Sequence, residues 1–471
     1  MHSSKVQERK RRASRWVSLG FGLLALASCA SVSKERGHDE VDRLVRERSG
    51  HPTRWAQGRP EDEQVARWVA DLGARGLTRG AAIEIALVNN PSLQETYEQL
   101  GVSQADLVQA GLLANPSIGA HIAFPVRGGG DEIQFSLIQN FLDVFVLPLR
   151  RQIAAEQFTV AVLRVAQQAL DTVADVEKEY AAVQAGAALV AFRKTAIDAA
   201  EGAAELSRAQ FAAGNVNELK HTTTLVGYEE AALDLAREEL ELLRHRERLN
   251  RLLGLAGASA EWRITDELPA PPASEPVLDD LEARAVRQRL DVDAARKQRQ
   301  LVGKALGLAR HTHLVGRLDV GVDAHQDADG PRVFGPSLTL ELPIFDQRQA
   351  VVARLEAQER QAAHRFDAVA LDARTEVRLA RAELTAARRI VERYATAILP
   401  MRDKVVEEAQ LYYNGMLLGL PQLVDVKQAQ VMAHAQYIAA VRDYWVAKAD
   451  LERAVGGPLA PQASTSNAGT P

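Results

Sequence analysis

The hydrophobic residues of this chain follow two periods, and the same succession of periods occurs twice. Most of the chain carries apolar residues three and four positions apart, which is the spacing of one face of an α-helix. Two shorter segments, residues 116–139 and 316–343, alternate apolar and polar positions instead, which is typical of β-strands with one apolar face. The pattern in each half of the chain therefore predicts a helix, two strands, a long helix and a second helix that runs back alongside it.

Each alternating segment predicts a β-hairpin, because its two runs flank a turn sequence, PVRGGGD in the first and HQDADGP in the second. The apolar positions form one face: Ile118, Ile122, Phe124, Ile133, Phe135, Leu137, Leu318, Val320, Val322, Leu338, Leu340 and Leu342. The polar positions form the other: His121, Gln134, Ser136, Asp319, Asp323, Thr339 and Glu341. Such strands suit either a soluble sheet with one buried face or a membrane sheet with one face toward lipid.

The helical segments are far longer than the typical globular helix of about 11–12 residues. Heptad seams run through both long helices, with members spaced three and four apart: Ala166, Ala169, Val173, Val176, Tyr180, Val183, Ala187 and Val190, and then Val377, Ala380, Leu384, Ala387, Val391, Tyr394 and Ile398. Pro400 lies inside the second long helix, where its missing N–H predicts a kink. Long seamed helices favour a coiled-coil tube or rod over a compact domain.

The two halves match over long stretches, which indicates a duplication. The matching pairs are Thr195 with Thr396 and Gly214 with Gly415, each 201 positions apart, and Gly254 with Gly456, 202 positions apart. A repeat of this size is one large supersecondary unit used twice rather than a short solenoid repeat. The change from 201 to 202 predicts one extra residue in the second turn.

The N-terminus has the pattern of an export signal. A basic start from Lys5 to Arg15 precedes an apolar run from Trp16 to Ala27. That run is shorter than the roughly 20 residues that span a bilayer and fits a cleaved signal peptide. Cys29, the only cysteine among 471 residues, follows Leu-Ala-Ser, which resembles a bacterial lipobox. We expect cleavage before Cys29 and acylation of its thiol, as by palmitate; the alternative is an incidental cysteine in a discarded signal.

These patterns divide the chain into six segments. They are a lipoprotein signal peptide (1–28), a lipid-anchored N-terminal arm (29–76), the first repeat (77–260), a proline-rich linker (261–277), the second repeat (278–457) and a disordered tail (458–471).

Charge and composition narrow the classes of partner. The chain has 57 basic and 62 acidic residues, so its net charge of −5 gives no reason to expect nucleic acid. After the signal no stretch is apolar enough for a transmembrane helix, so membrane insertion would depend on a lipid or on strands.

The sequence gives only weak signals for catalytic or metal sites. The segment from Asp323 to Gly330, DAHQDADG, alternates acidic residues but lacks the closing Glu of a calcium loop, so a hairpin turn is the preferred interpretation. His311 and His313 are interpreted as exposed residues where a strand begins. The sequence has no HExxH, phosphate-loop or G-x-S-x-G motif. We therefore expect no enzyme activity, no cofactor and no metal.

Three features resemble the TolC-like outer-membrane efflux family, lipoprotein type. They are AIEIALVNNPSL at 82–93, LELPIFDQRQA at 340–350, and an aromatic residue three positions before Gly in both turns. The resemblance covers about residues 77–457 and depends on the order of these features, which occurs twice. It implies a mainly α fold with a small β part: long antiparallel coiled-coil helices, four transmembrane β-strands per chain, a duplicated repeat, and a trimer forming a β-barrel and an α-helical tunnel.

The resemblance also implies a function. The protein would be the outer-membrane channel subunit of a tripartite efflux system, a passive exit duct that extends into the periplasm. Its partners would be two further copies of the chain, a periplasmic adaptor protein, an inner-membrane pump and outer-membrane lipid. The alternatives are a periplasmic adaptor-type coiled-coil lipoprotein and an exported enzyme. An adaptor has one helical hairpin between small β-domains, so the duplication argues against it, and the absence of a converging catalytic set argues against an enzyme.

Some site residues follow from the resemblance. Gly214 and Gly415 match the turn glycines of two periplasmic tips, where they would supply a positive φ. Asp425 matches an acidic position at the tunnel entrance, where three copies would form a cation-attracting ring; the alternative is a solvated aspartate. The family's second acidic position is Gln422 here. The residues expected to line a barrel lumen are His121, Gln134, Asp319, Asp323, Thr339 and Glu341.

Overall fold

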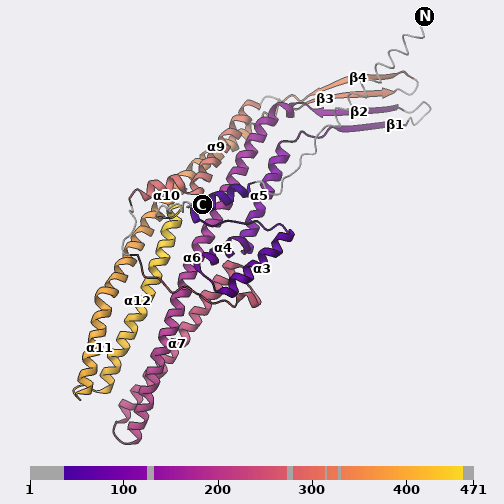
Figure 1. Ribbon diagram of the computed structural model, residues 1–471. Coiled ribbons are helices and arrows are strands. Elements are labelled where there is room, and N and C mark those ends of the chain that lie inside the picture. The colour runs from indigo at the N-terminus through magenta and orange to yellow at the C-terminus, as the bar shows by residue number, and fades with distance from the viewer. Residues whose placement is uncertain (1–36, 125–131, 273–278, 313–315, 327–329, 460–471) are drawn as a thin grey trace, which may run out of the picture.

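A computed structural model describes residues 37–124, 132–272, 279–312, 316–326 and 330–459. The predicted signal peptide, Cys29, His313 and nearly all of the predicted tail lie outside these residues. Figure 1 shows a long molecule that has a β-sheet at one end and two helical hairpins reaching toward the other end.

The first half of the chain forms helices, a strand pair and a helical hairpin. Its elements are α2 (His38–Ser49), α3 (Pro60–Arg75), α4 (Arg79–Asn89), α5 (Pro91–Ala110), β1 (Ser117–Ala123), β2 (Glu132–Asn140), α6 (Leu142–Ala212), α7 (Glu218–Leu253) and a short 3₁₀-helix, η1 (Gly257–Ala260). The second half repeats the order from α4 onward: α8 (Leu281–Gln288), α9 (Leu290–Thr312), β3 (Leu318–Gln326), β4 (Arg332–Leu340), α10 (Gln349–Arg393), the π-helix η2 (Tyr394–Ile398), α11 (Leu399–Asn414) and α12 (Leu420–Val455).

The strands form one antiparallel sheet in the order β1-β2-β3-β4, so the pairing of β2 with β3 joins the two halves of the chain. Directly paired residues share a face of a sheet. The register aligns Leu137 with both Ile118 and Val322, and Val320 with Leu338. The prediction that the apolar positions form one face is thereby confirmed across all four strands.

The strands are shorter than the predicted segments. Phe124, Glu341 and Leu342 lie just beyond the ends of β1 and β4. The chain still continues the pairing for one step, because the Glu341 N–H donates to the Arg317 carbonyl at 2.9 Å. Phe124 follows β1 at the outer end of the sheet, and Glu341 and Leu342 follow β4 at the end next to the helices, so the alternation in the sequence extends past the hydrogen-bonded strands at both ends.

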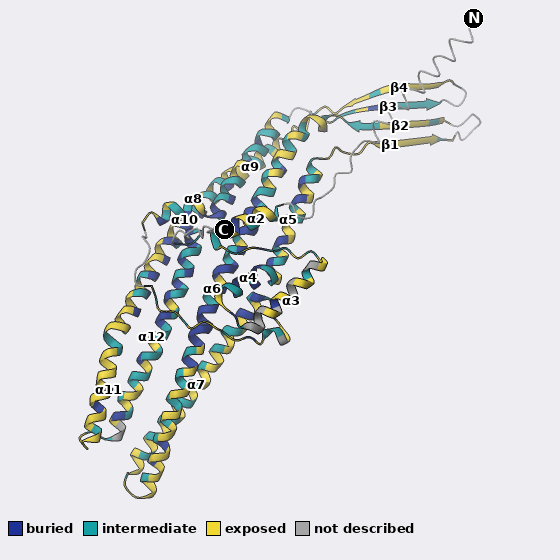
Figure 2. Ribbon diagram, in the orientation of Figure 1, coloured by how far each residue is buried: buried dark blue, intermediate teal, exposed yellow. Residues whose placement is uncertain are grey.

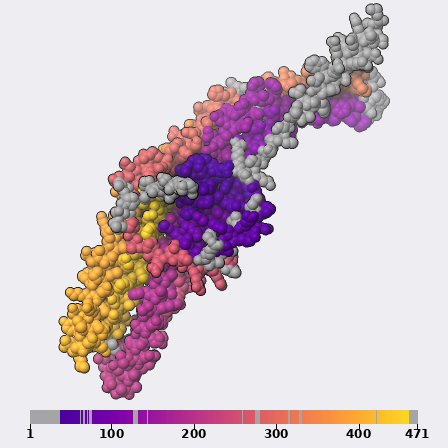
Figure 3. Space-filling view, in the orientation of Figure 1, coloured from indigo at the N-terminus to yellow at the C-terminus, as the bar shows by residue number. Residues whose placement is uncertain are grey.

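The core of the first half surrounds α6. Tyr97 and Tyr180 are almost completely buried, and the Tyr180 hydroxyl donates to the Leu77 carbonyl at 2.8 Å. Figure 2 shows buried residues concentrated in the middle of the molecule, and Figure 3 shows the N-terminal helices covering that region. The first predicted seam is buried except at Ala187, which is exposed.

A second core joins α8, α10 and α12. The predicted seam contributes its buried members Val377, Ala380, Leu384, Ala387 and Val391, and Tyr394 packs against them while partly exposed. Among the described helices, none combines the length and the apolar character needed to cross a membrane.

The extra residue of the second half lies in a helix and not in the turn. The buried seam residues Val190 and Val391 are 201 positions apart, whereas the turn residues with positive φ, Gly214 and Met416, are 202 apart. Between these two levels the long helix passes through the π-helix η2. A π-turn closes i→i+5 rather than i→i+4 hydrogen bonds, so it accommodates the additional residue. The prediction that placed this residue in the second turn is wrong.

The expected role of Gly415 is wrong for the same reason. Its φ is −79°, and the positive φ of the second turn, 58°, belongs to Met416. The first turn does use a glycine, because Gly214 has a φ of 73°. The helix before the second turn ends one residue later than a match to Gly415 requires, so the left-handed position falls on methionine.

Candidate functional site

One row of polar side chains crosses the sheet near its outer end. His121 on β1 is paired with Gln134 on β2, and Gln134 is paired with His325 on β3. His325 Nε2 lies 3.5 Å from the Glu132 carboxylate. His325 was not among the predicted lumen residues, although the alternation that identified Asp323 continues to it.

A second polar group lies on the same face, closer to the helices. Asp323 is paired with Ser136, and Asp319 is paired with Thr339. The Arg317 guanidinium contacts the Asp319 carboxylate at 2.9 Å. The structure thus brings five of the six predicted lumen residues to one face, and the sixth, Glu341, follows directly after β4.

Two glycines on this polar face lie close to serine side chains of the neighbouring strands. A Cβ atom on Gly119 would lie 2.6 Å from the Ser136 hydroxyl, and one on Gly321 would lie 2.7 Å from the Ser337 hydroxyl. A larger residue at Gly119 would force the Ser136 side chain to rotate away. At Gly321 a Cβ atom would also lie 2.8 Å from the Leu137 carbonyl oxygen, which cannot rotate, so this position is the more restricted of the two.

The opposite face of the sheet is apolar and uncovered within this chain. Ile118 is 81% exposed, Phe334 is 76% exposed and Leu338 is 70% exposed. Phe334 was missed from the sequence because Gly335 and Pro336 interrupt the alternating pattern, yet it pairs with Ala324 on this face. A continuous exposed apolar face of this kind requires a partner, since isolated soluble chains seldom expose one.

Aromatic residues mark the junction between the sheet and the helices. Phe141 and Phe145 meet edge to face with ring centroids 5.6 Å apart, and both side chains are exposed. In the second half Phe345 is 93% exposed just after β4. Aromatic side chains are favoured at the boundary between apolar and aqueous surroundings.

The two hairpin tips at the far end differ in character. At the first, the Phe211 ring stacks on His221 at 4.7 Å, and the Asn217 side chain caps α7 by accepting from the Lys220 N–H. At the second, Met416 and Leu417 project outward and are 94% and 76% exposed. The second tip is therefore an apolar projection and the first is a polar turn.

Asp425 is the sixth residue of α12, in its second turn, and is exposed. It borders a cavity of about 680 Å³ whose wall also includes Tyr394, Met401 and Met432. The predicted entrance residue is therefore close to the second tip, on the helix that returns from it.

The two outermost helices of the hairpin region carry apolar stripes. On α7 the exposed residues Leu219, Val226, Leu233 and Leu240 recur every seven positions. On the opposite edge, α10 exposes Leu379 and Ile390, eleven positions apart, and α11 exposes Met401 and Tyr412, also eleven apart, with the π-helix η2 between the two pairs. Helices α6 and α12 pack between these edges (Figure 1). Sequence reasoning found the inner seams and missed both outer stripes.

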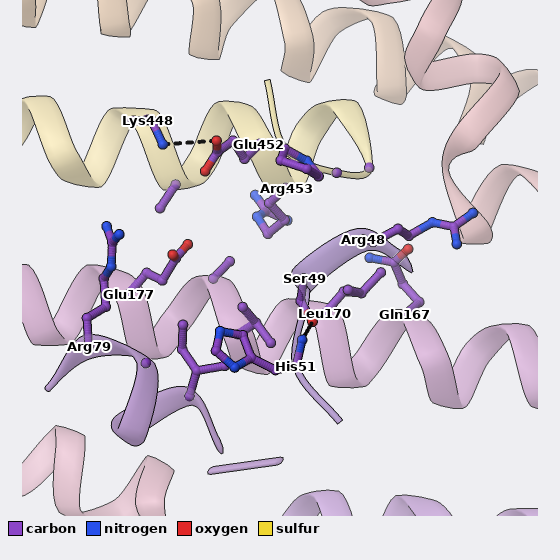
Figure 4. Close-up of a pocket in the computed structure, with 18 residues that line it drawn as sticks. Arg48, Ser49, His51, Arg79, Gln167, Leu170, Glu177, Lys448, Glu452 and Arg453 are labelled. Carbon is purple, nitrogen blue, oxygen red and sulfur yellow. Dashed lines mark hydrogen bonds and ion pairs between the residues drawn. The ribbon is translucent and has the colours of Figure 1, made fainter. Parts of the chain in front are cut away.

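A charged groove lies where the N-terminal helices meet α6 and α12 (Figure 4). It encloses about 320 Å³. Lys448 pairs with Glu452 at 2.9 Å, and Glu177 faces them from α6. Burial, together with the nearby Glu452 carboxylate, raises the pKa of Glu177, while Arg79 and Lys448 oppose that shift. Across the residues described, no three His, Cys, Asp or Glu side chains gather as metal ligands.

Comparison with solved structures identifies the fold. The chain superposes on a membrane protein from Pseudomonas aeruginosa with a TM-score of 0.70 and 20% identity, covering 80% of this chain and 91% of the other. The outer-membrane channel OprN gives 0.69 and 15%, covering 92% and 100%. The outer-membrane channel CmeC of Campylobacter jejuni gives 0.68 and 14%, covering 81% and 88%. No protein-family model and no curated protein matches the sequence. The mainly helical fold with a small antiparallel sheet, expected from the resemblance, is confirmed.

Proposed function

We propose that this chain is one of three identical subunits of an outer-membrane channel, the passive exit duct of a tripartite efflux system. The observation that carries the proposal is the sheet, which has one exposed apolar face and one polar face in a chain with the fold of solved outer-membrane channels. The apolar face would contact lipid, and the polar face with His121, Gln134 and Asp323 would line water.

The need for several copies follows from the open edges of the sheet. β1 and β4 each have one unpaired side. In lipid every backbone N–H and C=O needs a partner, so a spanning sheet must close into a barrel. A closed barrel needs about eight strands or more, which is twice what one chain supplies. Three copies give twelve strands, with β4 of one subunit beside β1 of the next.

The helices support the same closure. The stripe on α7 spans about 32 Å from Leu219 to Leu240, and the exposed pair Met401 and Tyr412 on α11 spans about 17 Å. Both lie next to the hairpin tips. The two edges of one chain are different surfaces, so association is head to tail, and such contacts generate rings when the rotation closes. The ring of helices would form the tunnel through the periplasm.

Location and partners follow from this arrangement. The sheet end would lie in the outer membrane, with the N-terminus held beside it by an acylated Cys29. The tips would face the inner membrane, where a periplasmic adaptor and a pump dock. The chain itself performs no chemistry in this scheme, and the pump supplies the energy.

The test is membrane fractionation and detergent extraction followed by native mass determination, on the wild type and on Cys29→Ser. We expect an outer-membrane complex of three subunits, each slightly below the 51.4 kDa of the full chain. Cys29→Ser should lose acylation and keep the trimer, because the strands insert independently of the lipid. A water-soluble Cys29→Ser monomer would contradict the proposal and favour an adaptor-type lipoprotein.

A further inference from the structure

We propose that Arg150, Arg317 and Arg348 form a binding site for a small anionic solute that carries phosphate or carboxylate groups. The three side chains line one cavity of about 420 Å³ where the sheet meets the long helices. They come from α6, from the residue before β3 and from the residue before α10. Cavities of this size accept small ligands, and guanidinium groups match the geometry of carboxylate and phosphate oxygens.

The cavity lies on the polar face of the sheet. Its wall includes Asn140, which is paired with Asp319, and Glu341, whose N–H donates to the Arg317 carbonyl. Arg317 is two positions before Asp319, so the alternation of a strand places both on one face. Their side chains also meet, with the guanidinium 2.9 Å from the carboxylate. Because this face would line water in the proposed channel, the expected ligand is a dissolved solute and not a lipid headgroup.

The position of Arg348 is unfavourable within the chain alone. Its φ of 57° is a left-handed conformation that strains most residues other than glycine. It occupies the N-cap of α10, where its side chain caps no N–H and the positive end of the helix dipole disfavours a cation. Strained residues of this kind concentrate at ligand-binding sites. A bound anion would offset the electrostatic part of this cost.

The charges around the cavity are not balanced. Three guanidinium groups line it together with one carboxylate, that of Glu341, and Asp319 pairs with Arg317 from just outside the wall. Helix α9 contributes only uncharged residues to the wall. Among the described residues, Arg348 has no carboxylate partner for its guanidinium, since Asp346 accepts only its backbone N–H. Each chain therefore offers an excess of positive charge to an incoming anion.

The consequence for transport rests on the proposed function, whereas binding is a property of the single chain. In the trimer, three such cavities would form a ring at the base of the barrel. Rings of arginine favour anions in a pore. This ring would lie at the opposite end of the helical tunnel from Asp425. The two sites would therefore act on the charge of a solute at different points of its path.

The first test measures binding of inorganic pyrophosphate to the detergent-solubilised full-length protein by isothermal titration calorimetry. Salt of about 0.15 M suppresses attraction to scattered surface charges. Arg348→Gln and Arg150→Gln each remove one guanidinium from the cavity, on different helices. Arg348→Lys keeps the charge but loses the forked donor geometry. The matched control is Arg354→Gln, which makes the same change at an exposed position of α10 outside the cavity.

We expect the wild type and Arg354→Gln to bind pyrophosphate alike. Arg348→Gln and Arg150→Gln should each weaken binding about tenfold or more, since each loses a charge-assisted hydrogen bond. Arg348→Lys should lose less, because a lysine still supplies the charge. Failure of the wild type to bind, or an equal loss in Arg354→Gln, would overturn the site.

Mass spectrometry of the purified protein separates a solute site from a lipid site. We expect no phospholipid whose retention depends on Arg348. A phospholipid held by the wild type and absent from Arg348→Gln would mean that the cavity faces lipid, and it would overturn the proposal of a solute site.

Planar-bilayer recording then tests the path. Pyrophosphate should reduce the current through the wild type and leave Arg348→Gln unaffected. Arg348→Gln should also raise the ratio of cation to anion permeability. Current that is insensitive to bound pyrophosphate would place the site outside the conducting path and overturn its role in transport. Absence of current in every variant, with binding intact, would refute the proposed function and leave the binding site standing.

Discussion

Met416 is the residue at which the second turn departs from ordinary backbone preferences. A non-glycine residue in the left-handed region costs roughly 1–2 kcal/mol through contact of its Cβ with the backbone. The surrounding hydrogen bonds hold it there, since the Leu417 N–H donates to the Tyr412 carbonyl at 2.8 Å. The Met416 side chain is also almost fully exposed, so no burial of apolar surface offsets the cost of its backbone conformation.

Met416→Gly should therefore raise the free energy of unfolding by up to about 1 kcal/mol, because glycine removes the strain while costing some chain entropy. Chemical denaturation of the detergent-solubilised protein measures this change. The matched control is Gly415→Ala, which should be nearly neutral because a Cβ there meets its nearest neighbour at an ordinary 3.5 Å. A large loss in Gly415→Ala would restore the original expectation for that glycine.

Glu177 gives a prediction about how the stability of the fold depends on pH. Its pKa is raised above the usual 4.5, so the folded chain holds this proton more tightly than the unfolded chain. Stability contributed by this group is therefore present at low pH and is lost as pH rises from 4.5 through the raised value. Glu177→Gln should make the protein more stable than the wild type near neutral pH, with the difference vanishing below pH 4.5. Thermal unfolding midpoints across this range measure it, and equal midpoints at pH 7 would contradict it.

At the scale of single elements, the sheet is the feature that separates a membrane channel from a soluble rod. Neighbouring positions of a strand point to opposite faces, so two adjacent substitutions test the assignment with the same residue type. Phe135 lies on the apolar face and Gln134 on the polar face of β2.

Phe135→Arg should impair insertion into outer membranes or lipid vesicles, because Arg on the lipid face costs about 2–4 kcal/mol at mid-membrane. Gln134→Arg should insert normally, since its side chain would face water. Heat-resistant, protease-protected trimer on gels measures insertion. Equal insertion of the two variants would mean that the faces are not lipid-facing and water-facing.

The apolar stripe on α7 gives a second prediction at this scale, about the contact between subunits. Leu233→Glu should abolish or strongly weaken the trimer, because a carboxylate buried in a helix contact without a partner costs several kcal/mol. Lys220→Glu adds the same residue in the first turn of α7, outside the stripe, and should leave the trimer intact. Native mass spectrometry compares them. A stable Leu233→Glu trimer would remove this stripe from the subunit contact.

At the scale of the whole molecule, threefold closure would bring single residues into rings. Asp425 is exposed near the second tip, and three copies would place three carboxylates around the entrance. Rings of acidic side chains favour cations in a pore. The ring belongs to the assembly and has no counterpart within one chain.

Asp425→Asn should lower the ratio of cation to anion permeability in planar bilayers while preserving conductance. Asp443→Asn is the control, because that carboxylate pairs with Arg442 at 2.8 Å on the distant half of α12. If Asp425→Asn leaves the permeability ratio unchanged, Asp425 is a solvated helix-face residue.

Several features were already determined by the sequence because they depend on local periods. Alternation along 116–139 and 316–343 identified the strands and their faces, and three-four spacing identified buried seam residues such as Val176 and Leu384. The matching helix-end glycines Gly254 and Gly456 both adopt the left-handed conformation, at φ 67° and 85°. Hydrophobic periodicity and helix-ending glycines depend on residues only a few positions apart, so both can be read from the sequence alone.

Other features were decided only by tertiary structure. The extra residue was assigned to a turn from numbering alone, whereas packing of the seam against α12 fixes the helix down to Val391 and leaves the π-turn below it as the place of adjustment. The positive φ then moves from Gly415 to Met416. The pairing of β2 with β3 also joins residues far apart in the chain, and no local pattern carries that information. The outer stripes have a local period, but only the packing of α6 and α12 between them shows that they are left exposed.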